Sequence, residues 1–178
     1  DKGAGKVLPI AGATAFVDPR LAELGVRVLA PAGQTAALLL GLDEVPLAEY
    51  EALRLELGVP DGSRDLPVEK ALLLESGFDE LHGVDWQKGC YMGQELTART
   101  KYRGLIKRRL FPVKVEGALP PPGTPVERDG REVGEIRSGL GDRALAMLQL
   151  DAAEGPLTAE GATLHAERPA WMQIAAKP

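Results

Sequence analysis

The sequence predicts an α+β protein whose C-terminal part folds as a small antiparallel β-barrel. Up to residue 104, short strand-like segments are mixed with segments whose apolar residues recur at helical spacing. After Gly104 the pattern changes to short apolar runs separated by Gly- and Pro-rich turns, which is typical of a barrel of short strands. A length of 178 residues is enough to bury a core without disulfides.

The first forty-odd residues combine two predicted strands with one predicted helix. Ala13–Val17 and Val26–Ala30 are short apolar segments, and each is followed closely by a proline. Residues 33–42 favour a short helix with a glycine near its end. Two strands and one helix seldom enclose a core by themselves, so this part is expected to belong to a larger α+β layer.

Two further helices are predicted before the barrel. The clearer one spans residues 46–57, where Pro46 suits the first turn and Gly58 suits the C-terminal cap. It is followed by a turn-rich segment, residues 58–67, that is expected to be a loop. The second helix spans residues 92–103.

The helix over residues 92–103 carries both charge and apolar side chains. Glu95 and Arg99 are four residues apart in the order that favours an ion pair. Leu96 and Tyr102 are expected to face inward, because they are the larger apolar side chains of this segment.

The C-terminal strands are marked by their turns. Asp129-Gly130 is a strong hairpin signal. Strands are expected on both sides of it and further along the chain, at residues 107–116, 124–128, 132–137, 144–150, 163–166 and 171–175. We therefore divide the chain into three parts. Residues 1–44 form part of an α+β domain, residues 45–104 form the remainder of the α+β region and contain the stretch around Cys90, and residues 105–178 form the barrel.

Composition excludes several classes of protein. Cys90 is the only cysteine, so an internal disulfide and a zinc site built on several thiolates are both excluded, and a reducing compartment is expected. No run of about eighteen apolar residues occurs, so no membrane span is expected.

The charge is distributed unevenly along the chain. The net charge is −5, yet Lys88–Lys114 contains eight Lys or Arg and one acidic residue, Glu95. Such a basic patch could contact a phosphate, a polyglutamate tail, nucleic acid or an acidic partner. The alternative is a solvated helix face whose charges are paired.

Cys90 lies in a glycine-rich turn just before the helix predicted to start near Met92. Backbone N–H groups at a helix N-terminus stabilise a thiolate, and Lys88 would act in the same direction. A reactive or metal-binding thiolate is therefore one interpretation; a small cysteine that fills a gap in the core is the other.

His82 could approach Cys90, but no residue is obviously placed to orient it as in a cysteine hydrolase. One thiolate cannot hold an iron–sulfur cluster alone, so any cluster at Cys90 would be shared with another chain or a small thiol.

Glu75 is a carboxylate inside an apolar run, Leu72–Phe78. A buried acid is costly unless it has a partner, so a ligand contact is one interpretation of this position. The alternative is that Glu75 points to solvent at a turn.

The residues around Cys90 resemble a known family. KGCYMGQE at Lys88–Glu95 is similar to the signature of the YgfZ/GcvT-like folate-binding proteins. The continuation LTARTKYRGLIKRRLFPV and three upstream segments resemble the mitochondrial and α-proteobacterial branch of that family; these segments are RLELGVPDGSRDLP at Arg54–Pro67, LLLES at Leu72–Ser76 and GVDWQ at residues 83–87. The resemblance covers most of residues 15–140.

This resemblance implies a fold, a cofactor and a set of site residues. The family has two α+β domains and a C-terminal barrel arranged around tetrahydrofolate, and it is related to the aminomethyltransferase of the glycine cleavage system. Cys90 then corresponds to the functional cysteine and Glu75 to the folate-contacting carboxylate. The other cofactor-binding residues expected by resemblance and by charge are Lys88, Tyr91, Gln94, Glu95, Arg99 and Arg103, and no metal site is expected. Family members extend further at the N-terminus, so part of the first two domains is expected to lie outside this sequence.

Three functional hypotheses follow from the resemblance and the residues. The first is a folate-binding accessory factor that acts with iron–sulfur assembly proteins or client enzymes in the maturation of [4Fe–4S] proteins, and that is not itself an enzyme. The second is a folate-dependent one-carbon transferase in which Glu75 handles protons. The third is an RNA-binding protein linked to tRNA modification, using the basic patch. The expected location is the cytoplasm, or the mitochondrial matrix if the host is eukaryotic.

Overall fold

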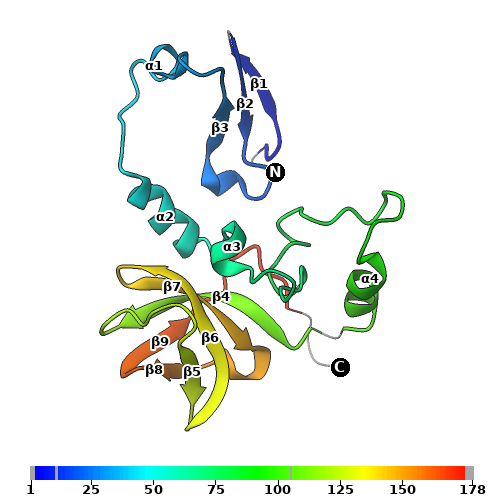
Figure 1. Cartoon of the computed structure of the whole chain (residues 1–178), viewed down its shortest axis with the longest axis vertical. Coiled ribbons are helices and arrows are strands. Elements are labelled where there is room, and N and C mark those ends of the chain that lie inside the picture. Colours follow the sequence, from blue (N-terminus) through cyan, green and yellow to red (C-terminus); the bar gives the residue numbers. More distant parts are fainter. Residues whose placement is uncertain (1–2, 11, 105, 175–178) are drawn as a thin grey trace. The chain divides into compact units, whose positions relative to one another are not determined.

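The computed structural model describes residues 3–10, 12–104 and 106–174 of the chain (Figure 1). These residues form two compact units, Asp1–Tyr50 and Glu51–Pro178. The division falls inside a helix, α2 (Leu47–Glu56). The three-part division at residues 44 and 104 stays a prediction.

The first unit is built on a three-stranded antiparallel sheet. The sheet has the order β1-β2-β3 and is followed by one short helix. Its elements are β1 (Val7–Ile10), β2 (Ala13–Val17), the 3-10 turn η1 (Ala22–Leu24), β3 (Val26–Leu29) and α1 (Thr35–Leu38). The two predicted strands are confirmed. The predicted helix over residues 33–42 is a single helical turn of four residues.

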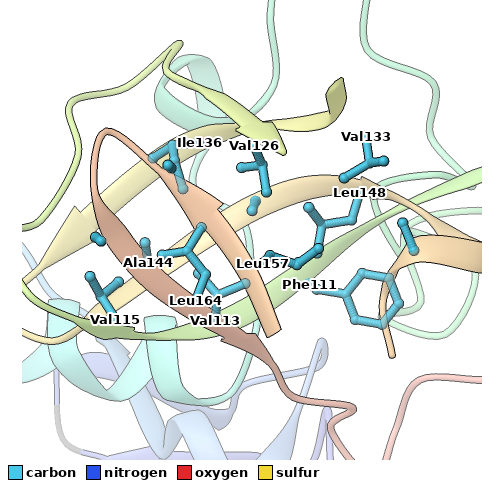
Figure 2. Close-up of a cluster of buried hydrophobic side chains, with 14 of the residues drawn as sticks. Phe111, Val113, Val115, Val126, Val133, Ile136, Ala144, Leu148, Leu157 and Leu164 are labelled. Carbon is cyan, nitrogen blue, oxygen red and sulfur yellow. The ribbon is translucent and has the colours of Figure 1, made fainter. Parts of the chain in front are cut away.

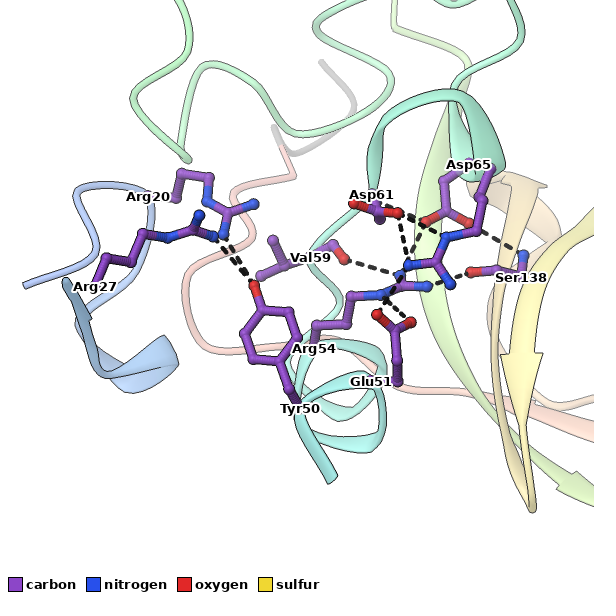
Figure 3. Close-up of polar contacts among 10 residues, drawn as sticks. Arg20, Arg27, Tyr50, Glu51, Arg54, Val59, Asp61, Asp65 and Ser138 are labelled. Carbon is purple, nitrogen blue, oxygen red and sulfur yellow. Dashed lines mark hydrogen bonds and ion pairs between the residues drawn. The ribbon is translucent and has the colours of Figure 1, made fainter. Parts of the chain in front are cut away.

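Asp18 is the polar centre of the first unit. Its side chain is only 1% exposed, and it accepts hydrogen bonds from the side chains of Arg20 at 2.9 Å and Arg27 at 2.5 Å. Both guanidinium groups also donate to the Tyr50 hydroxyl, each at 3.2 Å (Figure 3). Burial raises the pKa of Asp18, but the hydrogen bonds from the two arginines outweigh it and lower the pKa to about 2. The carboxylate therefore ties the end of β2 to β3 and to Tyr50.

Two helices lie between the sheet and the barrel in sequence. The predicted helix over residues 46–57 is confirmed as α2, and Gly58 follows it with a φ of +72°, a left-handed conformation that suits glycine. The prediction that residues 58–67 form only a loop is wrong, because Gly62–Asp65 forms one helical turn, α3. The Asp65 side chain accepts the backbone N–H of Asp61 at 2.8 Å, so the turn-forming residues close into a helical turn.

The second unit contains the predicted C-terminal barrel, which is confirmed. Six antiparallel strands close in the order β4-β7-β6-β5-β8-β9 (Figure 1). They are β4 (Arg108–Glu116), β5 (Pro125–Arg128), β6 (Arg131–Leu140), β7 (Arg143–Gln149), β8 (Pro156–Ala159) and β9 (Ala162–Ala166), with the 3-10 turn η2 (Leu150–Ala152) after β7. The sequence patterns did not indicate β8. The predicted strand at 171–175 is wrong for residues 171–174, and residue 175 lies outside the described residues.

The barrel encloses an apolar core (Figure 2). Val113, Ile136, Leu148, Leu157 and Leu164 come from five different strands and are 0% exposed. Side chains alternate across a strand, so every second residue of each strand can reach this interior. Burial of this kind contributes about 1.5–3 kcal/mol for each large aliphatic side chain, which makes the barrel the main source of stability in the second unit.

The β5–β6 hairpin turns as the sequence predicts. Asp129 and Gly130 have φ angles of +53° and +74°, as required at both central positions of a type I′ turn. The strand pairing continues directly from this turn, with Arg128 opposite Arg131.

Candidate functional site

The signature turn, which we define as residues 88–93, leads into the helix α4 (Gln94–Tyr102). The predicted helix over residues 92–103 is therefore confirmed. Gly93 precedes it with a φ of +86°. Gln94 folds back, and its Oε1 accepts the backbone N–H of Tyr91 at 3.3 Å. These contacts fix the conformation of the chain just after Cys90.

Cys90 is an exposed, free cysteine in the signature turn. The interpretation of Cys90 as a filler of the core is therefore wrong. Nearby, the Lys88 ammonium lies 5.1 Å from the centre of the Tyr91 ring, a distance that allows a cation–π interaction. The Tyr91 hydroxyl is buried and has no hydrogen-bond partner among the described residues. The turn thus presents a thiol to solvent beside a cation.

Asp79 holds the inner face of α4. Its carboxylate accepts hydrogen bonds from the Trp86 indole at 2.6 Å and the Lys101 ammonium at 2.8 Å. Lys101 also lies 4.2 Å from the Trp86 ring centre, and Trp86 contacts Tyr102 edge-on. Burial raises the pKa of Asp79, but the hydrogen bonds from Lys101 and Trp86 outweigh it, so the net shift is downward. An ionised Asp79 therefore links α4 to the chain before the signature turn.

The side chains that α4 exposes differ from those that the sequence predicts to be exposed. Leu96 and Tyr102, which are predicted to face inward, are 56% and 77% exposed. Thr97 is buried instead, and the Lys101 side chain, which is 38% exposed, is bound to Asp79. The physical reason is that a polar pair, rather than apolar packing, anchors this helix. Glu95, Arg99 and Arg103 are also exposed.

Glu75 lines a pocket of about 330 Å³ in the second unit. Its backbone carbonyl accepts the N–H of Leu110 at 2.9 Å, which holds it beside β4. Burial raises the pKa of the Glu75 carboxyl, and the charge of Arg108 offsets part of that rise. Glu75 is therefore neither fully buried nor fully exposed, and its contact with a ligand stays a prediction. The pocket is lined by Asp65, Pro67, Lys70, Ala71, Leu72, Glu75, Ser76, Arg108, Glu135, Arg137 and Met147.

A buried polar network reaches this pocket through one of its members, Asp65 (Figure 3). Asp65 accepts from Arg54 Nη1 at 2.9 Å and from the backbone N–H of Ser138 at 3.1 Å. Arg54 Nη2 donates to the Ser138 hydroxyl at 3.0 Å, and Arg54 Nε pairs with Glu51 at 2.8 Å. The network therefore joins α2 and α3 to strand β6 of the barrel.

The pocket contains only part of the predicted site. Glu75 is the one predicted cofactor-binding residue in its lining. The others belong to the signature turn and to α4 or its C-terminal cap; they are Lys88, Tyr91, Gln94, Glu95, Arg99 and Arg103. Sequence reasoning missed Asp65 and Arg137, and it included Arg108 only as a member of the basic patch. The buried position of Asp65 could have been suspected from its place in the RLELGVPDGSRDLP segment, whereas the barrel residues carry no local signal.

Within residues 3–10, 12–104 and 106–174, no group of three or more His, Cys, Asp or Glu side chains could hold a metal ion. None of the helices in those same ranges has the length and apolar character needed to cross a membrane.

Comparison with known proteins gives consistent matches. Residues 107–174 match the family described as CAF17, C-terminal beta-barrel domain. The human protein named iron-sulfur cluster assembly factor IBA57, mitochondrial, is 41% identical, covering 98% of this chain and 52% of that protein. Its mouse counterpart is 40% identical, covering 94% and 50%, and the homologue from Pyricularia oryzae is 35% identical, covering 80% and 42%.

The fold is also similar to a solved structure. The glycine cleavage system aminomethyltransferase T from Bartonella henselae aligns over 93% of this chain and 51% of its own, with a TM-score of 0.69 and 17% identity. At that identity the likeness concerns the fold alone.

These matches confirm the resemblance that the Lys88–Glu95 motif indicates. The chain is a homologue of the IBA57 proteins within the YgfZ/GcvT-like family, with the barrel described for CAF17 at its C-terminal end. It spans about half the length of the curated relatives it matches.

Proposed function

We propose that the chain acts as a folate-binding accessory factor in the maturation of iron–sulfur proteins, including [4Fe–4S] proteins, with Cys90 as the functional thiol. The observation that carries this proposal is 41% identity, over 98% of the chain, to a protein named as an iron–sulfur cluster assembly factor. The exposure of Cys90 in the matching signature turn supports it, because a thiol must be accessible to exchange a ligand with a partner.

Cys90 cannot complete a cluster site within this chain. Iron–sulfur clusters are ordinarily held by four protein ligands, and Cys90 is the only cysteine in the sequence. In this proposal the cluster is cargo. Cys90 supplies one ligand while an iron–sulfur assembly protein or a client enzyme supplies the others.

We propose the pocket at Glu75 as the binding site for tetrahydrofolate. The residues fit a pterin, because Glu75 is a half-buried carboxylate and can accept hydrogen bonds from the amino and ring N–H groups. On the barrel side of the pocket, the Arg137 guanidinium pairs with Glu135 at 2.6 Å, and its Nε keeps one donor without a partner among the described residues. When bound, folate would supply its one-carbon chemistry. Contact between folate and the predicted residues of the signature turn and α4 stays a prediction.

The function is tested in cells whose only copy of the gene carries Cys90→Ala. We expect the activity of a [4Fe–4S] enzyme to fall, while the amount of its polypeptide stays constant. His82→Ala is the matched control, because His82 is the histidine that precedes Cys90 in the sequence and is exposed. Wild-type enzyme activity in the Cys90→Ala strain would refute the role of the thiol. Loss of activity in both strains would instead favour a cysteine–histidine pair.

A folate-dependent one-carbon transferase is the second candidate. It is favoured by the raised pKa of Glu75, because a carboxyl whose pKa lies closer to neutrality exchanges protons more readily. Incubation with tetrahydrofolate and an aminomethyl donor would then yield methylene-tetrahydrofolate. No product above background would eliminate this candidate and leave the accessory role in place.

The location follows from the relatives and the redox argument. The curated relatives are named as mitochondrial, so they do not support the cytoplasm as the general expectation. We place the chain in the mitochondrial matrix for a eukaryotic host and in the cytoplasm for a bacterial one.

A further inference from the structure

The outer face of α4 carries apolar and cationic side chains that the proposed chemistry does not use. Met92, in the signature turn before the helix, is 100% exposed, and Leu96, in the first turn of the helix, is 56% exposed. Arg99 and the C-cap residue Arg103 follow Leu96 at intervals of three and four residues, which places these three on one face of the helix. Cys90 lies two residues before Met92.

The opposite side of α4 is anchored to the chain before the signature turn. Thr97 and Lys101 lie on the opposite side of α4, where Thr97 is buried and Lys101 is bound to Asp79 and Trp86. The helix therefore has few ways to turn its apolar residues inward. The exposure of Leu96 and Arg99 therefore follows from the side of α4 that the fold anchors.

The two arginines on this face are available to pair with acidic groups of a partner. Neither Arg99 nor Arg103 forms an ion pair within the part of the chain that the structure describes, and both are exposed. Glu95 is the single acidic residue of α4. Methionine, arginine and aromatic residues are enriched at protein interfaces, whereas lysine is depleted, and the outer face has this composition.

We propose that the outer face of α4, defined as Met92, Leu96, Arg99, Tyr102 and Arg103, is a docking surface for a protein that presents carboxylates around an apolar patch. The apolar residues would be covered by the partner, and the two arginines would pair with its acidic rim. The proposal goes beyond the role of Cys90, because it concerns where a partner binds and not what the thiol does.

A nucleic acid fits this surface less well than a protein does. Phosphate binding favours a continuous row of cations, and stacking of successive bases favours several aromatic rings. This surface has two arginines and one ring, Tyr102, whose ring already contacts Trp86, and Lys101 is already engaged by Asp79. Binding of tRNA is therefore treated as the competing outcome of the test.

The test measures binding of the purified chain to the purified iron–sulfur carrier proteins of its host, by titration calorimetry at low and at physiological salt. We expect one acidic carrier to bind, and its affinity to fall by about tenfold or more with Leu96→Ala and again with Arg99→Glu. Higher salt should weaken wild-type binding, because the arginines contribute through charge. Total tRNA is titrated in parallel.

The controls separate this surface from the rest of the molecule. Arg131→Glu reverses an exposed cation on β6, and Val68→Ala shortens an apolar side chain that is 76% exposed; neither should change the affinity. Cys90→Ala reports on the proposed function and not on this surface. Affinity that is unchanged in the Leu96 and Arg99 variants would overturn the proposal, as would binding of tRNA alone or binding of no carrier.

Discussion

Arg54 Nη1 lies 2.9 Å from Asp65 Oδ2, and the two side chains are 3% and 0% exposed. This buried ion pair joins α2 to α3, and through Ser138 it reaches strand β6 of the barrel. Asp65 also lies in the wall of the pocket that contains Glu75. The pair therefore connects the stability of the second unit to the shape of the proposed folate site.

Loss of Asp65 should destabilise the second unit strongly. Asp65→Ala leaves Arg54 charged and buried without its partner, and such a change typically lowers the free energy of unfolding by about 3–5 kcal/mol. Asp61→Ala is the matched control, because its ion pair with Arg64 is about half exposed and should contribute less than about 1 kcal/mol. Urea unfolding of both variants measures the difference, and equal effects would contradict this assignment.

Acid should weaken the first unit through Asp18. Its pKa is lowered to about 2 in the folded chain, below the ordinary value of about 3.9. A carboxyl with a lowered pKa stabilises the fold above its unfolded pKa, and that contribution is lost as the pH falls from about 4 towards 2. Unfolding followed by circular dichroism should show a steeper loss of stability over this window in the wild type than in Asp18→Asn. Identical pH profiles would argue against the Asp18 cluster.

The ionisation of Glu75 should affect the free energy of unfolding in the opposite direction to that of Asp18. Its pKa is raised because it is partly buried, so ionisation costs stability above its unfolded pKa, and this cost disappears as the pH falls. Glu75→Gln should therefore leave stability at neutral pH unchanged or slightly higher.

The same substitution should weaken tetrahydrofolate binding at least tenfold, since a charged acceptor is lost. Calorimetry at neutral pH measures this, with the exposed Glu116→Gln as control. Unaltered affinity in Glu75→Gln would move the folate site elsewhere.

Removal of the Asp79 carboxylate should loosen α4. Asp79→Ala removes the acceptor that binds both Trp86 and Lys101, so the helix keeps few tertiary contacts and short helices are marginal alone. Amide hydrogen exchange over Gln94–Tyr102 should become faster, with little change in the barrel strands. Asp85→Ala serves as control, because Asp85 accepts only local backbone N–H groups. Unchanged protection of α4 would show that other contacts hold it.

The barrel could be predicted because its signals are local. The Asp129-Gly130 turn and the Gly- and Pro-rich connections fix short strands by backbone conformation alone, and the closed barrel follows from their number and spacing. Strand β8, Pro156–Ala159, was not predicted. The helix α4 was predicted from residues that form helices well, which is again a local property.

The candidate site could be predicted only in part, because much of it depends on distant residues. Leu96 and Tyr102 were expected inside on the basis of their apolar character, but the orientation of α4 is set by Lys101 and by Asp79, which is 22 residues away in sequence. The pocket similarly combines Glu75 with Arg108 and Arg137 of the barrel. Such pairings require the tertiary fold, whereas Cys90 could be identified from its motif.

The most direct test of the proposed role of Cys90 is the transfer of a cluster in vitro. The chain is mixed under anaerobic conditions with a cluster-loaded iron–sulfur carrier protein of its host and an apo [4Fe–4S] enzyme, and the recovery of enzyme activity is followed over time. The wild type should accelerate recovery, and Cys90→Ser, which keeps the size of the side chain but removes the thiolate, should abolish the acceleration. Equal acceleration by Cys90→Ser and the wild type would contradict the assignment of Cys90 as the functional thiol.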